Sequence, residues 1–310
     1  MIIGFYPKVD IISLMNQLAI IGPTASGKSE LAIETALKHD AYILSIDSLA
    51  IYKEADIVSA KPSKEELSFV PHFGIDELCI DEHFSVDTFL RLYKKVRQKC
   101  KTDEKNLIIV GGTSFYLKRL LEGLSPVPDP SEEVARKVER MLQNLPKAYS
   151  YMQEKDRLYM KNIAPNDRYR IEKALLIFEA SGKTPSEWFS LNPPKPVIED
   201  LDIYEIAVER DVLRERIKKR TRKMLENGLV DEVCSLEHKY TREPNPMKAI
   251  GIVETLDYLD GKLDKDELEE QIVVHTSQLA KRQQTFNKNQ FEKRVSLPLE
   301  ELRKRLKNLS

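Results

Sequence analysis

Short apolar runs, each followed by a segment with helical spacing, dominate the pattern of hydrophobic positions along the chain. Four of these runs predict β-strands, at residues 18–21, 41–46, 106–110 and 201–208. The alternation of strands and helices is typical of a parallel sheet with helices on both faces. The sequence therefore predicts an α/β fold. The helix after the first strand is expected to bury an apolar face made of Leu31, Ala32, Ile33, Ala36 and Leu37.

The carboxyl-terminal third of the chain has helical spacing and many charged residues. Residues 211–240 predict a long basic helix, in which Asn227-Gly228 is a stop signal and in which Arg216 and Arg220 share a face. Such a charge run is more often a solvated helix surface than a binding face. Residues 264–284 and 292–310 predict two further helices, the second charged and amphipathic.

Two proline clusters divide the chain. Residues 125–130 and 193–196 hold three prolines each, and such clusters indicate hinges or domain boundaries. The stretch between them lacks a strand pattern and is rich in helix formers. We expect three parts: an N-terminal extension at 1–14, a core domain at 15–130 with 197–310, and a helical insertion domain at 131–196. Residues 52–53 and 60–63 are interpreted as surface loops of the core.

The run between the first strand and its helix carries the clearest chemical signal. Glycine, four residues and then Gly-Lys-Ser form a P-loop, in which backbone N–H groups and the positive end of the helix dipole converge on a phosphate. Lys28 adds a mobile positive charge, and the Ser29 hydroxyl is a candidate ligand for Mg²⁺. The candidate phosphate-binding residues are Gly22, Pro23, Thr24, Ala25, Ser26, Gly27, Lys28 and Ser29.

Composition and net charge limit which cellular compartment and which binding partners are expected. The chain has 310 residues and a formal net charge of −1, so no global positive field indicates a nucleic-acid partner. Its three cysteines, Cys79, Cys100 and Cys234, lack metal-ligand spacing and fit a reducing cytoplasm. No apolar run reaches the roughly 18 residues of a membrane span, so we expect a cytoplasmic protein that does not contact a membrane.

Polar turns follow the second and third predicted strands, at the edge of the sheet where ligands bind. Asp47 fits two interpretations equally, because an acidic residue there can reach a metal or reacting group or can cap a helix. An NTP hydrolase also needs an apolar strand that ends in a metal-binding aspartate. The third strand ends in Gly111-Gly112-Thr113 instead, which weakens the hydrolase interpretation.

The sequence resembles the bacterial tRNA dimethylallyltransferases (tRNA isopentenyltransferases). The P-loop, Gly-Pro-Thr-Ala-Ser-Gly-Lys-Ser, is similar to the form found in that family. Similar motifs occur at 47–53, 59–62, 110–116, 166–171 and 280–283, in family order over about residues 18–290. The chain departs from common family patterns at four positions that are expected to shape the substrate site, namely Ala50, Ile252, Ser277 and Phe286.

The resemblance implies a P-loop NTPase-like parallel sheet flanked by helices, with a mostly helical insertion domain. It implies transfer of a dimethylallyl group from dimethylallyl diphosphate to N6 of the adenosine 3′ to the anticodon, adenosine-37. By this resemblance the P-loop and Mg²⁺ hold the diphosphate. Asp47 is the general base, Thr24 donates to the bridging oxygen and Arg220 neutralises the leaving group.

The resemblance also implies a partner, the anticodon stem-loop of tRNA, bound by a monomeric enzyme. The candidate tRNA-binding residues are Asp47, Ser48, Leu49, Ala50, Thr113, Arg168, Arg170, Lys281, Arg282 and Gln283. Two alternatives stay open. A nucleotide kinase or ATPase built on the same loop predicts tight ATP binding. An RNA-binding protein with a vestigial loop predicts that Asp47→Ala changes no activity.

Overall fold

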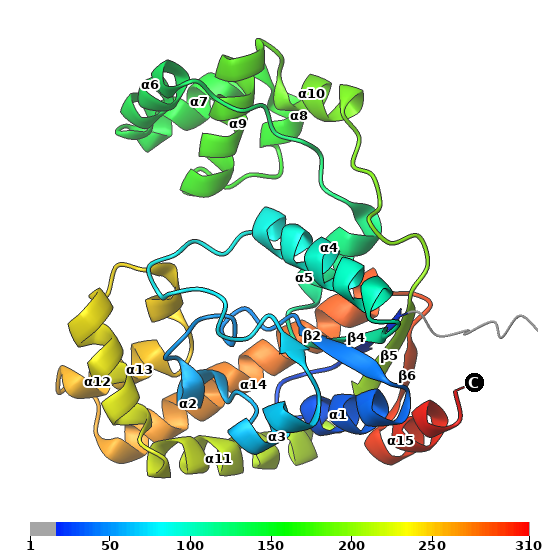
Figure 1. Cartoon of the computed structure of the whole chain (residues 1–310). Helices are drawn as coiled ribbons and strands as arrows, with labels where there is room; N and C mark the ends of the chain where they lie inside the picture. Colours follow the sequence, from blue (N-terminus) through cyan, green and yellow to red (C-terminus); the bar gives the residue numbers. More distant parts are fainter. Residues whose placement is uncertain (1–16, 310) are drawn as a thin grey trace, which may run out of the picture. The chain divides into compact units, whose positions relative to one another are not determined.

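The computed structural model describes residues 17–309, so the expected N-terminal extension at 1–14 lies outside the described residues. The chain divides into two compact units (Figure 1). Among the described residues, the core unit contains residues 17–118 and 200–309, and the helical unit contains Arg119–Glu199. The expected boundaries at 131 and 196 fall inside the helical unit.

Within residues 17–309, six strands form one parallel sheet in the core unit, in the order β3-β2-β4-β1-β5-β6. The predicted parallel sheet is therefore confirmed. The strands are β1 (Gln17–Ile21), β2 (Ala41–Ser45), β3 (His72–Phe73), β4 (Asn106–Gly111), β5 (Asp202–Ala207) and β6 (Val295–Pro298). The carboxyl ends of the central strands are in register, since Ile21 pairs with Gly111 and Ser45 with Val110. The turns that follow β1, β2 and β4 consequently meet at one edge of the sheet.

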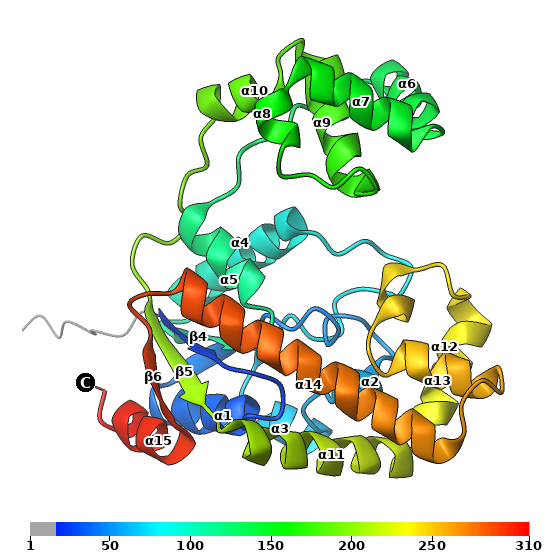
Figure 2. The same cartoon turned by 180° about the vertical axis from the view of Figure 1, so that it is seen from behind.

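Helices cover both faces of the sheet. On one face, α1 (Lys28–Lys38) and α15 (Leu299–Lys307) lie side by side in both views (Figures 1 and 2). They are joined by a 2.7 Å hydrogen bond between His39 Nε2 and the Leu306 carbonyl oxygen. On the other face, α4 (Val86–Thr102) has Ser85 as its N-cap, whose side chain accepts from the Thr88 N–H.

The remaining helices belong either to the core unit or to the helical unit. The core unit adds α2 (Asp56–Ser59), α3 (Lys64–Phe69), α11 (Arg210–Glu226), α12 (Leu229–Tyr240), η1 (Asn245–Lys248), α13 (Ile252–Leu259) and α14 (Lys265–Gln290), and α5 (Ser114–Glu122) leads into the helical unit. The helical unit contains α6 (Glu132–Leu142), α7 (Leu145–Lys155), α8 (Arg157–Met160), α9 (Arg168–Ser181) and α10 (Pro185–Leu191) around its own apolar cluster. None of the described helices has the length and apolar character needed to span a membrane.

Two predicted helices differ from the structure. The long basic helix at 211–240 is wrong as one element, because Gly228 adopts a left-handed conformation with φ of 97° and separates α11 from α12. The stop signal at Asn227-Gly228 was therefore the correct part of that prediction. The helix predicted over 292–310 is also wrong at its start, where β6 pairs with β5 and extends the sheet.

Burial corrects three further expectations. Leu37 is 58% exposed, because it lies about 100° around the helix from the buried Ala36 and points away from the sheet. The supposed surface loops are also wrong in part, since Tyr52 is buried and the Lys61 side chain is only 5% exposed. The Lys61 ammonium can be buried because it donates to the Tyr52 carbonyl oxygen and to two carboxylates, those of Asp56 and Asp76.

Candidate active site

The P-loop connects β1 to α1 and leaves the amino end of that helix open. Gly27, the N-cap of α1, has a left-handed φ of 96°, a conformation that favours glycine. No side chain of the described residues caps α1 through a hydrogen bond. Its first N–H groups are therefore left for another acceptor, which a bound anion can supply.

Two adjoining cavities lie at the edge of the sheet where β1, β2 and β4 end. The smaller one, here called the P-loop cavity, has a volume of about 90 Å³, and Lys28 and Ser29 help to line it. The larger one, the outer cavity, has a volume of about 510 Å³ and opens toward solvent. Six residues line both cavities and mark their junction: Thr24, Asp47, Ser59, Gly112, Arg220 and Gln283.

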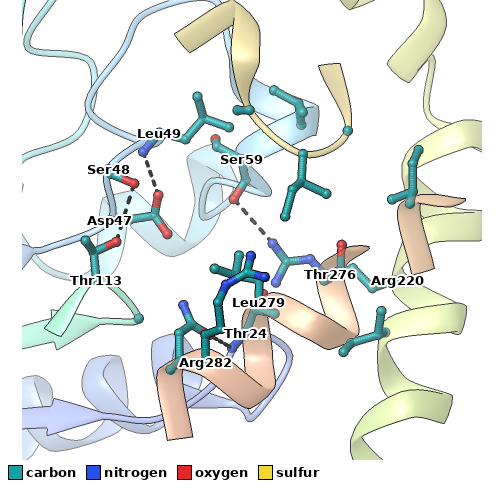
Figure 3. A pocket seen from close by; sticks show the side chains of 18 of the residues that line it. Thr24, Asp47, Ser48, Leu49, Ser59, Thr113, Arg220, Thr276, Leu279 and Arg282 are labelled. Carbon is teal, nitrogen blue, oxygen red and sulfur yellow. Dashed lines mark hydrogen bonds between the residues drawn. The ribbon is translucent and has the colours of Figure 1, made fainter. Parts of the chain in front are cut away.

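Asp47 lies at this junction with its two carboxylate oxygens in different situations. Oδ1 accepts hydrogen bonds from the backbone N–H groups of Leu49, at 2.8 Å, and Ala50, at 3.1 Å. Among the described residues, no hydrogen bond reaches Oδ2. Figure 3 shows Asp47 and Thr113 on one side of the outer cavity and Arg220 on the opposite side. One oxygen therefore caps a turn rather than the helix that the second interpretation supposed, and a role of the other oxygen toward a metal or reacting group stays a prediction.

Two cations interact with the Asp47 carboxylate, Arg220 at the junction and Lys28 in the P-loop cavity. Lys28 Nζ donates to the Pro23 carbonyl oxygen at 2.7 Å. Burial, together with the charge of Arg220, lowers the pKa of Lys28 to about 8, although the Asp47 carboxylate opposes this shift. Burial likewise lowers the pKa of Arg220, and Asp47 again opposes it. Two desolvated cations beside one carboxylate favour an anionic ligand, which would stabilise their charged forms.

The P-loop cavity also offers oxygen ligands for a divalent metal ion that is bound mainly through a ligand. Ser29 and Asp47 are among its lining residues. Within the described part of the chain, no group of three or more His, Cys, Asp or Glu side chains is arranged to hold a metal. Mg²⁺ commonly keeps several waters and takes one or two protein oxygens together with phosphate oxygens. A serine hydroxyl in a phosphate-binding loop matches that mode of binding.

The basic face of α11 points at the P-loop. Arg216 Nη1 donates to the Ser26 carbonyl oxygen at 3.4 Å, and Arg220 Nη2 donates to the Ser59 carbonyl oxygen at 3.3 Å. The usual interpretation of a charge run, a solvated surface, is therefore wrong for Arg220, which is half-buried and lines both cavities, but it holds for Arg216, which is exposed. The solvated-surface interpretation also holds for Arg222, because that side chain is 56% exposed and pairs with Glu269.

Sequence reasoning missed Glu232, which holds one wall of the site. Its carboxylate accepts from three successive backbone N–H groups at the start of α2, those of Asp56, Ile57 and Val58, at 2.7 to 2.9 Å. The last residue of α2, Ser59, accepts from Arg220. No sequence signal links residues 232 and 56–58, because the pairing depends on how α12 packs against α2.

Removing the Glu232 carboxylate should destabilise the fold. We expect Glu232→Ala to lower the free energy of unfolding by ~1–2 kcal/mol, as for the loss of a helix cap. Glu232→Gln should lie between this variant and the parent, because it keeps one acceptor oxygen. Urea unfolding at constant m-value measures the effect. Glu226→Ala, at the exposed end of α11, is the control, and equal midpoints for all variants would contradict the expectation.

The structure gathers most of the candidate tRNA-binding residues around the outer cavity. Ser48, Leu49, Thr113, Arg282 and Gln283 line it together with Asp47. Thr113 Oγ1 also donates to Ser48 Oγ at 3.4 Å. Ala50 lines the P-loop cavity, and Lys281 lines a separate hollow along α14 that it shares with Arg282.

Two candidates, Arg168 and Arg170, lie in the helical unit at the start of α9. Arg168 donates to the Leu142 carbonyl oxygen and to Glu139, and Arg170 pairs with Asp167. Both guanidinium groups remain about half exposed or more.

The four departures from common family patterns lie in different environments. Ala50 is buried and lines the P-loop cavity. Phe286 lines the outer cavity and packs edge-on against Phe291. Ser277 donates to the Val273 carbonyl oxygen within α14. Ile252 is fully buried in the cluster beneath α12 and α13, so the expectation that it shapes the substrate site is wrong.

Comparisons with known proteins agree over nearly the whole chain. A family model described as IPP transferase matches residues 50–290. A tRNA dimethylallyltransferase of Sulfurimonas denitrificans is 64% identical, over 93% of this chain and 97% of that protein. Another of Sulfurovum sp. is 54% identical, over 94% of this chain and 97% of that protein. The crystal structure of the full-length tRNA isopentenylpyrophosphate transferase of Bacillus halodurans has a TM-score of 0.69 at 27% identity, with 95% of both chains covered.

Proposed function

The chain belongs to the IPP transferase family, and we propose that its two adjoining cavities carry out that family's reaction on tRNA. The enzyme transfers a dimethylallyl group from dimethylallyl diphosphate to N6 of adenosine-37, the adenosine on the 3′ side of the anticodon. The observation that carries the proposed roles is that Thr24, Asp47 and Arg220 line both cavities. A group bound in one cavity can therefore react with a group bound in the other.

The P-loop cavity is proposed to hold the diphosphate. The open amino end of α1 and the cations of Lys28 and Arg220 supply the positive potential that an anion needs. Ser29 would hold a divalent metal ion, here proposed to be Mg²⁺, which neutralises charge on the phosphate oxygens when bound. The Thr24 hydroxyl would donate to the bridging oxygen. These interactions strengthen as negative charge grows on the leaving group, so they favour the transition state.

The outer cavity is proposed to admit the adenine and the dimethylallyl group. Apolar side chains are available for the latter, because Ile217, Met224, Ile272 and Leu279 line this cavity. The adenosine would leave the anticodon-loop stack to enter, as in other enzymes that modify a base. Asp47 Oδ2 would then accept a hydrogen bond from the N6 amine.

The proposed chemical step is a substitution at the first carbon of the dimethylallyl group. A bond forms between N6 and that carbon, and the bond from the carbon to the bridging oxygen breaks. The proton of N6 passes to the Asp47 carboxylate, and the electron pair of the broken bond leaves with the diphosphate. Asp47 both orients the amine and removes its proton, so the two cavities must meet at this residue.

The proposed partner is the anticodon stem-loop of tRNA, bound by one copy of the chain in the cytoplasm. Ser48, Thr113 and Arg282 line the outer cavity and would contact the nucleotides that flank the extruded adenosine. The exposed guanidinium groups of Arg168 and Arg170 would supply phosphate contacts from the helical unit.

Label transfer tests this function directly. Purified protein with Mg²⁺ and labelled dimethylallyl diphosphate should label an anticodon stem-loop that carries an A-A-A stretch. The control is the same stem-loop with guanosine in place of adenosine-37, which lacks the N6 amine and should stay unlabelled. Absence of label from the first RNA with folded protein would overturn the proposal. Phosphate release from ATP under the same conditions would favour the kinase or ATPase alternative.

A further inference from the structure

Gln283, on α14, bonds to the P-loop across almost the whole length of the sequence. Its Oε1 accepts a hydrogen bond from the backbone N–H of Thr24 at 3.0 Å, although 259 positions separate the two residues. In a P-loop such an N–H usually faces the bound phosphate. Here a side chain of the protein holds it, beside the residue whose hydroxyl is proposed to meet the bridging oxygen.

Gly112, in the turn after β4, makes room for that side chain. Its φ lies outside the left-handed region, so its backbone conformation does not require glycine. Glycine is needed at position 112 because a larger side chain would have no room there. The three heavy atoms nearest to a Cβ added at Gly112 all belong to Gln283, and Nε2 would lie closer than 3.0 Å. The absent side chain of Gly112 and the amide of Gln283 therefore fit together.

We propose that Gln283 is a positioning residue for the P-loop: its amide fixes Thr24 against the leaving group, and Gly112 is a glycine in order to admit it. This inference rests on the proposed prenyl transfer and changes the role of Gln283, which the family resemblance placed among the tRNA contacts. The neighbouring Arg282 lines the outer cavity but not the P-loop cavity, whereas Gln283 lines both.

Two single variants and their combination test the proposal. Gln283→Ala removes the acceptor for the Thr24 N–H. Gly112→Ala should displace the Gln283 amide, because the far end of a flexible side chain can move at little cost to the fold. Each variant should lower kcat by about 10- to 100-fold, as expected for misplacement of a reacting group by up to ~1 Å. The Kd for tRNA should stay within about twofold of the parent.

The double variant distinguishes a shared mechanism from two separate ones. Once Gln283→Ala has removed the amide, an alanine at 112 has no side chain left to displace. Gly112→Ala/Gln283→Ala should therefore be no slower than Gln283→Ala alone, so the two effects should not add. Should Gly112→Ala prove unstable in urea, the double variant should regain that stability for the same reason.

Gln284→Ala is the matched control, because Gln284 is the next residue of α14 and donates to the Val208 carbonyl oxygen rather than bonding to a P-loop residue. It should keep kcat near that of the parent. The proposal is overturned if the losses of the single variants multiply in the double variant. It is also overturned if Gln283→Ala weakens tRNA binding and leaves kcat unchanged. A parent enzyme that transfers no label would instead contradict the proposed function itself.

Discussion

Asp47→Asn should lower kcat by about 10²–10⁴-fold and leave the affinity for tRNA unchanged. The amide oxygen of asparagine can still accept from the N–H groups of Leu49 and Ala50, so the turn after β2 keeps its hydrogen bonds. What the variant loses is a group that takes a proton from the N6 amine, and loss of a general base costs this much rate. Single-turnover label transfer at saturating tRNA measures the chemical step.

Asp47→Ala separates the two functions of this carboxylate. It should lose the same rate as Asp47→Asn and in addition ~1 kcal/mol of unfolding free energy, because the turn loses its acceptor. Equal rates for parent and Asp47→Asn would contradict the role of general base. Loss of tRNA binding in Asp47→Asn would show instead that the carboxylate acts mainly as an RNA contact.

Arg220→Gln should lower kcat by about 10²–10³-fold, which is the cost of removing one group that stabilises charge developing in a desolvated site. Arg220 lines both cavities, and its guanidinium bonds to the Ser59 carbonyl oxygen at their junction. Arg220→Lys should recover part of the loss, since it keeps the charge without the planar fork of donors. The rate of label transfer and the Kd for inorganic pyrophosphate, measured by calorimetry, both test this.

The control for Arg220 lies on the same helix. Arg222→Gln removes a guanidinium that is 56% exposed and paired with Glu269, and such surface pairs contribute little. Its rate and pyrophosphate affinity should equal those of the parent. If both variants weakened pyrophosphate binding equally, the effect would come from the general charge of α11 rather than from the position of Arg220.

The sequence predicts the part of the fold that depends on local pattern. Four of the six strands within residues 17–309 were predicted, because their apolar runs are buried at the centre of the sheet. The two that were missed, β3 and β6, are edge strands. β3 has only two residues, and the residues of β6 alternate between half-buried and exposed, so neither produces a continuous apolar run. Gly228, part of the stop signal inside the one long helix that was predicted, divides two helices in the structure.

The candidate site was predictable where a motif sets its own geometry. The P-loop and the turn at Asp47 needed only their neighbours in sequence and the rule that ligands bind at the carboxyl ends of parallel strands. Glu232 and the pairing of Gln283 with Gly112 were missed, because they depend on contacts between residues far apart in the chain. An acidic or amide side chain on a helix gives no indication of which distant backbone group it will meet.

The late position of α14 in the chain has a consequence for biosynthesis. A growing polypeptide leaves the ribosome with its amino end first, so the loop at 22–29 emerges long before the partners that complete it. Gln283 and the strand and helix that follow it, β6 and α15, are made much later than that loop. A nascent or prematurely terminated chain would expose the loop without the amide that fixes Thr24. Catalytic competence should therefore appear only after α14 has been translated.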